Sequence, residues 1–320
     1  ANGDAVETLP FVTAIDFAEL TEVTELLTIA SVPEGVYDEV VIRLDFSGAE
    51  IIVQDEEGEP VAVTAVYKGG APLAEVDIRL RLTTADTIRI AAGRPAAFSL
   101  DFDLDASNTI DLNAAQVVVE PFFLATPELE TDREHRVRGV LKTVDLAASE
   151  FALRVRPFRH RTGQFGEFTV TIDEETQFEV DGEGLTGQAG LEAIAALDEA
   201  APVVSSGVIS MTGMSADMVL GGSSVPWSNA DVVIGVVSAR DGAVLTIRGG
   251  HVLFADGRRA FRGEFAVTLT EDTVISAPGV DNAALSEMSV SVGQRVVAWG
   301  EFSDDVSLSA QRVRMRMNQV

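Results

Sequence analysis

The chain has 320 residues and no cysteine, and its 51 Asp and Glu against 23 Lys and Arg give a formal net charge of −28. The composition excludes disulfides, thiolate metal sites and cysteine nucleophiles, and so negative a field disfavours nucleic acid as a partner. No apolar run is long enough to span a bilayer, so we expect no transmembrane segment.

The first residues, Ala1 to Asp4, contain an Asn-Gly pair before the extended stretch 5–9. Asn-Gly is a strong signal for a hairpin turn, but a hairpin needs a strand before its turn. Two interpretations remain open. The segment is a polar start of no consequence, or the first domain lacks its first strand and presents an open edge that another strand could fill.

Short Val-, Ile- and Phe-rich segments then alternate apolar and polar residues, for example over 40–46, 75–82 and 98–104. Alternation predicts strands with one buried face, whereas the helical spacing of apolar residues over 19–30 predicts a short helix. The polar stretch 126–132 resembles a linker. We therefore expect an acidic β-sandwich domain over residues 1–130.

The remaining sequence contains an internal repeat, with predicted domains over 136–221 and 231–320. Glu167-Phe168-Thr169-Val170-Thr171 returns as Glu264-Phe265-Ala266-Val267-Thr268, and Val203-Val204 returns as Val296-Val297. Three strands, a helix and two strands are expected in each copy, with a helical piece near 283–288 in the second. That order is typical of a five-stranded OB-like barrel. The predicted fold is all-β: an N-terminal β-sandwich, two tandem OB-like small β-barrels and few short helices.

Acidic residues supply one candidate site. Asp101, Asp103 and Asp105 would stand in a row on one face of a strand, where Ca²⁺ could relieve their repulsion. A solvated acidic face is the alternative. No other cofactor is expected.

Arginines supply the second set of candidates. Seven lie between 133 and 161, and a C-terminal strand alternates arginine with apolar residues. They could contact the acidic domain, another copy of the chain or an anionic polymer. The interaction residues are Arg154, Arg156, Arg159, Arg161, Arg312, Arg314 and Arg316.

A glycine motif, Gly182 to Gly187, matches the dinucleotide pattern G-x-G-x-x-G. The corresponding stretch of the second repeat, 276–282, lacks it, and the surroundings do not form a βαβ unit. We therefore interpret the motif as a turn before the barrel helix. The three histidines, His135, His160 and His251, have no metal-ligand spacing, and no catalytic residues are assigned.

Several motifs of the first 130 residues resemble an uncharacterised family of exported bacterial putative lipoproteins. These motifs are Thr24–Leu27, Val32–Tyr37, Ile42–Leu44, Leu100–Ser107 and Val119–Phe122. The region from Arg138 onward resembles a second family of unknown function, small exported β-barrels found in tandem. The resemblance implies a β-sandwich followed by barrels and export to the periplasm, cell surface or extracellular space. It transfers no catalytic residues.

The sequence therefore predicts a non-enzymatic, exported structural or adhesive protein of the cell surface that could assemble with copies of itself by β-strand complementation. The alternative is a binding module for a divalent cation or an anionic glycan.

Overall fold

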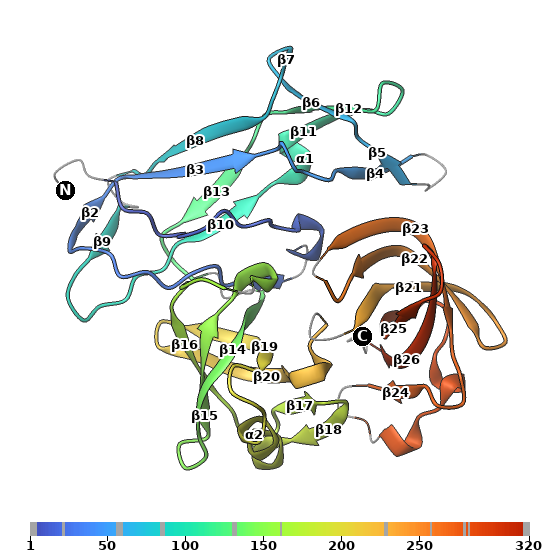
Figure 1. Cartoon of the computed structure of the whole chain (residues 1–320). Helices are drawn as coiled ribbons and strands as arrows, with labels where there is room; N and C mark the ends of the chain where they lie inside the picture. Colours follow the sequence, from blue (N-terminus) through green and yellow to red (C-terminus); the bar gives the residue numbers. More distant parts are fainter. Residues whose placement is uncertain are drawn as a thin grey trace. The chain divides into compact units, whose positions relative to one another are not determined.

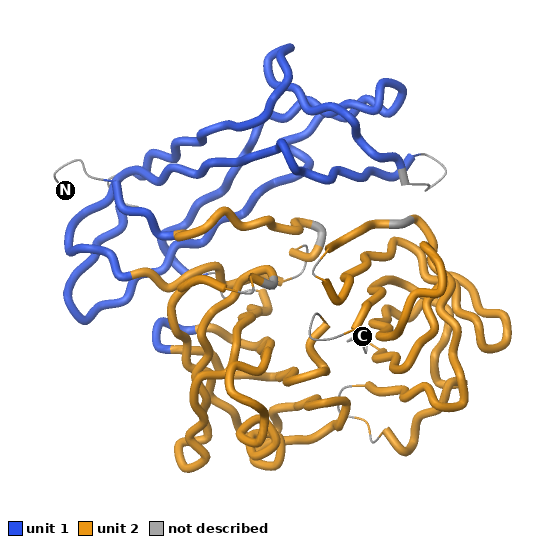
Figure 2. Tube along the Cα trace, in the orientation of Figure 1, with its two compact units in different colours: residues 1–8, 31–132, 210–212 blue, residues 9–30, 133–209, 213–320 orange. Residues whose placement is uncertain are grey.

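The computed structural model describes residues 5–20, 23–55, 60–83, 87–129, 133–160, 162–226, 230–256, 258–277, 280 and 282–315. The chain is all-β with few short helices, as predicted. It divides into two compact units, shown in Figure 2: unit 1 comprises residues 1–8, 31–132 and 210–212, and unit 2 comprises 9–30, 133–209 and 213–320.

Unit 1 is built from short sheets (Figure 1). Four are two-stranded, β2–β9, β3–β8, β4–β5 and β10–β13, and one has the order β11-β12-β6-β7. The elements are β2 (Gly35–Tyr37), β3 (Glu39–Asp45), β4 (Ile52–Gln54), β5 (Pro60–Ala62), β6 (Ala65–Lys68), β7 (Ala71–Pro72), β8 (Glu75–Arg81), β9 (Ile88–Ile90), β10 (Ser99–Phe102), α1 (Leu104–Ser107), β11 (Asn108–Asp111), β12 (Gln116–Val119) and β13 (Phe123–Thr126).

The 9–30 segment is assigned to a different part of the chain than the sequence predicts, since the sequence places it in the domain of residues 1–130. It belongs to unit 2 and forms a 3-10 turn, η1 (Phe17–Leu20), and a strand, β1 (Val23–Glu25), in place of the predicted helix. Strand β1 pairs in parallel with the start of β14 (Glu134–Asp145), and its β-branched Val23 and Thr24 suit a strand. Residues 5–8 form no strand, and residues 1–4 lie outside the described part of the chain.

The first barrel closes through the strand order β14-β15-β16-β20-β19 and back to β14, in unit 2 (Figure 1). A hairpin, β17–β18, and helix α2 complete it. The elements that follow β14 are β15 (Glu150–Val155), η2 (Pro157–Arg159), β16 (Glu167–Thr171), β17 (Gln177–Val180), β18 (Glu183–Thr186), α2 (Gly187–Ala195), β19 (Pro202–Ser210), β20 (Gly213–Gly221) and η3 (Gly222–Ser224).

The second barrel repeats this pairing, with the order β21-β22-β23-β26-β25 and back to β21. Two 3-10 turns replace the helix expected near 283–288. The elements are β21 (Asp231–Asp241), β22 (Val244–Leu253), β23 (Arg259–Thr268), β24 (Val274–Ser276), η4 (Asn282–Ala284), η5 (Glu287–Ser289), β25 (Arg295–Phe302) and β26 (Ser307–Met315).

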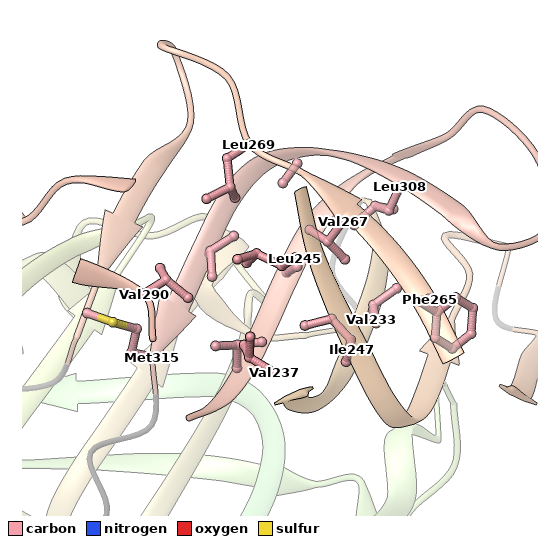
Figure 3. Packing of buried hydrophobic residues seen from close by; sticks show 14 of the residues in the cluster. Val233, Val237, Leu245, Ile247, Phe265, Val267, Leu269, Val290, Leu308 and Met315 are labelled. Atoms are coloured by element: carbon pink, nitrogen blue, oxygen red, sulfur yellow. The ribbon is translucent and has the colours of Figure 1, made fainter. Parts of the chain in front are cut away.

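Each barrel holds a dense apolar core. Figure 3 shows the core of the second barrel, where Val233, Ile247, Phe265 and Leu308 are completely or almost completely buried. Unit 1 contrasts with it: among its described residues only Val117, Val119 and Ser107 are buried. Because burial of apolar surface is the main source of stability, the two barrels are the most stable part of the chain.

A repeated glycine explains part of the internal sequence repeat. A Cβ atom at Gly207 in β19 would lie 2.1 Å from the carbonyl oxygen of Ser215, and one at Gly300 in β25 would lie 1.9 Å from that of Ser309. Both neighbours are backbone atoms of the adjacent strand. Glycine is therefore required for the close approach of two strands at the same place in each barrel.

Candidate functional site

The β3–β8 ribbon has open edges. Among the described residues, neither strand pairs with a third. The Leu82 N–H donates to the backbone carbonyl of Asp38 at 2.8 Å, and the Phe46 N–H donates to that of Ala74 at 2.6 Å. In the register of this pair, these bonds show that the even-numbered residues of 38–46 are the ones hydrogen-bonded to β8. The N–H and C=O groups of the odd-numbered residues, including Val41, therefore point away from β8 and are available to another strand.

The outer face of the ribbon carries charges of both signs around one apolar residue. Arg43 Nε donates to Asp77 at 2.8 Å, and Arg79 Nη1 donates to Glu39 at 3.1 Å. Between these exposed pairs Val41 is 48% exposed. Charged side chains protect many natural edge strands from association, but here the centre of β3 is apolar.

The opposite face of the ribbon is incompletely covered. Val40, Ile42 and Leu44 of β3 are only half-buried, and so are the inward residues of β8. A two-stranded ribbon is marginally stable by itself. An additional strand beside β3 would extend both its hydrogen-bond ladder and its apolar face.

The row of three carboxylates predicted on one strand, on which the calcium site was proposed, is not formed. Strand β10 ends at Phe102, Asp103 caps α1 by accepting the Ala106 N–H at 2.9 Å, and Asp105 lies in the helix. Asp101 alone remains on the strand, so the three carboxylates do not share a face. Asp103 is a favoured helix N-cap residue, and this local preference ended the strand.

Two of the seven arginines lie in a buried ionic cluster. Arg136 Nε donates to Glu25 at 2.6 Å, and Arg138 donates to Glu19 at 2.5 Å and lies 3.2 Å from Glu25. The Glu25 side chain is 0% exposed and that of Arg138 is 3% exposed. Burial lowers the pKa of Arg136. The cluster fastens the 9–30 segment to the first barrel.

Arg154 and Arg156 line a cleft of about 920 Å³ in unit 2. Pro10 and Phe11 of the 9–30 segment and Gln164 lie along the same cleft. Among the described residues, no carboxylate lies within ion-pair distance of either arginine. Arg156 Nη1 donates to the carbonyl of the preceding residue, Val155, at 2.9 Å, and its buried Nε has no partner in the described part of the chain.

His160, whose ring centroid lies 6.4 Å from that of Phe11, has two arginines nearby. Burial lowers the pKa of His160, and the nearby Arg259 and Arg156 lower it further. Burial and the neighbouring Arg154 likewise lower the pKa of Arg156. Arg161 and the side chain of Arg159 lie outside the described part of the chain.

The C-terminal arginines contact the first barrel. Arg312 Nη2 donates to the Ser223 carbonyl at 2.5 Å, and Arg314 Nη1 donates to that of Ser224 at 3.2 Å. Both guanidinium groups lie over the ring of Trp299, at 4.1 and 5.1 Å from its centroid. Arg316 is not among the described residues.

The glycine motif belongs to the same contact between barrels. Gly182 lies in the turn of the β17–β18 hairpin, and its carbonyl accepts the Asn282 amide at 2.8 Å. Buried Glu179 of the hairpin accepts a hydrogen bond from Ser276 at 3.3 Å. The motif therefore belongs to a hairpin that joins the two barrels. It does not lie in the βαβ unit that a dinucleotide-binding motif requires.

Comparison with protein-family models and with curated proteins finds no match to this sequence. Within the described residues, no group of three or more His, Asp and Glu side chains is placed to hold a metal ion. No helix in that part of the chain is long and apolar enough to cross a membrane.

Proposed function

We propose that this chain is a non-enzymatic, exported structural or adhesive protein of the cell surface that assembles with its own copies by β-strand addition. The observation that carries the proposal is the open edge of β3, where Val41 directs its backbone polar groups away from β8. Unpaired strand edges are the surfaces to which proteins add a strand from a partner.

The chemistry of the edge favours a second copy as the partner. When two β3 strands pair antiparallel about a two-fold axis at Val41, Glu39 of each copy lies opposite Arg43 of the other. Glu39, Val41 and Arg43 all carry outward-pointing backbone groups, so the hydrogen-bond ladder and the charges match in the same register. Over the paired stretch from Glu39 to Arg43, no two like charges lie opposite one another.

The polar clusters of unit 2 support a structural role. Glu25 fastens the 9–30 segment to the first barrel, and Glu179 with Arg314 joins the barrels, at 3.7 Å. Asp16 lies 3.4 Å from His251 of the second barrel. These polar contacts link separate elements of unit 2, as a structural role requires.

Val41→Pro is expected to abolish self-association. The N–H of Val41 donates no bond to β8, so proline removes no bond within the ribbon but blocks the addition of a strand. Size-exclusion chromatography with light scattering should give the mass of a dimer or larger assembly for the unaltered chain and that of a monomer for the variant.

Val41→Thr is the matched control, because threonine is also β-branched and keeps the backbone donor. It should associate as the unaltered chain does. A monomeric unaltered chain at high concentration, or a Val41→Pro variant that associates normally, would contradict assembly through β3.

A further inference from the structure

The cleft beside Arg154 and Arg156 is independent of strand addition and lies in unit 2. Its walls come from segments far apart in sequence: Pro10 and Phe11, strand β15, and the stretch from Gly163 to Glu167. A Cβ atom at Gly163 would lie 2.7 Å from the Phe11 ring, so the ring is seated directly on this glycine. Phe11 also packs on buried Phe165, with ring centroids 5.4 Å apart.

The charge of the cleft is opposite to that of the whole chain. The formal net charge is −28, yet the described carboxylates leave Arg154, Arg156 and nearby Arg259 without an ion pair. Glu167 is the one carboxylate among the described residues that lines the cleft, and Lys142 holds it at 2.5 Å. Glu167 is also the cross-strand partner of Arg154, but it forms its ion pair with Lys142, so the cleft keeps more positive than negative groups and favours a bound anion.

The groups around the arginines narrow the class of anion. Guanidinium groups bind planar carboxylates through paired hydrogen bonds. Phe11, 47% exposed, and Pro10 offer an apolar platform for the face of a sugar ring, and Gln164 and Glu167 offer acceptors for hydroxyl groups. Inorganic phosphate or sulfate has neither a ring face to pack on this platform nor the several hydroxyl groups that those acceptors would bind. A volume of about 920 Å³ suits a ligand of several rings.

The geometry points to a binding site for an acidic saccharide, in which Arg154 and Arg156 hold the carboxylate of a uronic acid and Phe11 packs on its ring. Bound in this way, the saccharide neutralises the cleft and connects the chain to a carboxylated polysaccharide.

Tri-galacturonate is a suitable probe in isothermal titration calorimetry with the full chain. Arg154→Gln and Arg156→Gln should each weaken its binding about tenfold to a hundredfold, because each removes a hydrogen bond between charged groups. Arg248→Gln is the matched control, since Arg248 is an exposed strand arginine of the second barrel that pairs with Glu264 at 3.3 Å. It should leave the affinity unchanged.

Maltotriose tests whether binding needs a carboxylate, and inorganic sulfate tests whether binding needs a sugar ring. We expect no binding of the neutral sugar and much weaker binding of sulfate at equal ionic strength. Absence of tri-galacturonate binding by the folded, unaltered chain would overturn the proposal. Equal loss in Arg248→Gln, or equal affinity for sulfate, would also overturn it. Thermal melting of each variant verifies that its barrels are folded.

Discussion

Glu25→Ala is expected to lower the free energy of unfolding of unit 2 by about 3–5 kcal/mol, the cost of removing one partner from a buried ion pair. Glu25 is the completely buried acceptor for Arg136 at 2.6 Å and lies 3.2 Å from Arg138, whose side chain is 3% exposed. It also accepts the Phe158 N–H at 3.3 Å. Without it, the two desolvated guanidinium groups lose a shared counter-charge and retain their ion pairs with Glu19.

Urea denaturation followed by circular dichroism measures this loss. The matched control is Glu264→Ala, which removes the partner of Arg248 from an exposed pair of the same unit. The control should cost less than about 1 kcal/mol. Equal effects of the two substitutions would contradict the role of Glu25 in fastening the 9–30 segment.

Gly300→Ala is expected to destabilise the second barrel by about 3 kcal/mol, the upper end of the usual cost of overpacking a core. The added methyl group would lie 1.9 Å from the Ser309 carbonyl oxygen and 3.1 Å from the Ala310 Cα. Both atoms belong to the backbone of β26, which is paired on its other side with β23 and β24, so the strand cannot move aside freely. Gly207→Ala should have a comparable effect on the first barrel.

Gly184→Ala is the control for this prediction. Its new Cβ atom would meet only the Val280 carbonyl, at 3.6 Å, which is an ordinary contact. Thermal unfolding should separate the variants by several degrees. If Gly300→Ala melted with Gly184→Ala, the close approach of β25 and β26 would not need glycine.

The barrels were predictable because their signals are local. The repeated segment from Glu167 to Thr171 forms β16 (Glu167–Thr171), and α2 (Gly187–Ala195) is the helix expected in the first copy. Hairpin β17–β18 was missed, because Gly184 in β18 and the glycines on either side of this strand resemble a loop signal. Its pairing with β20, far along the chain, supplies the stability that local propensity lacks.

The candidate sites were harder to predict, because their partners are distant in sequence. The local sequence around Glu25 does not predict that Glu25 lies in a strand paired in parallel with β14, opposite Arg136. The prediction that Asp101, Asp103 and Asp105 lie in a row on one strand was wrong for a local reason. Asp103 caps a helix, and this capping competes with continuation of the strand. The sequence singled out Arg154 and Arg156, but the cleft that they share with Phe11 depends on the fold.

The most direct test of strand addition through β3 is a disulfide between two copies at position 41. The chain has no cysteine, so Val41→Cys introduces a single thiol. In the two-fold pairing the Cα atoms of the two substituted residues would lie about 5.5 Å apart, within the range that a disulfide spans.

Val274→Cys is the matched control, because Val274 in β24 is also 48% exposed. Under mild oxidation, non-reducing electrophoresis should show a covalent dimer for Val41→Cys and a monomer for Val274→Cys. Cross-linking of Val41→Cys that is no faster than that of Val274→Cys would contradict the proposed assembly.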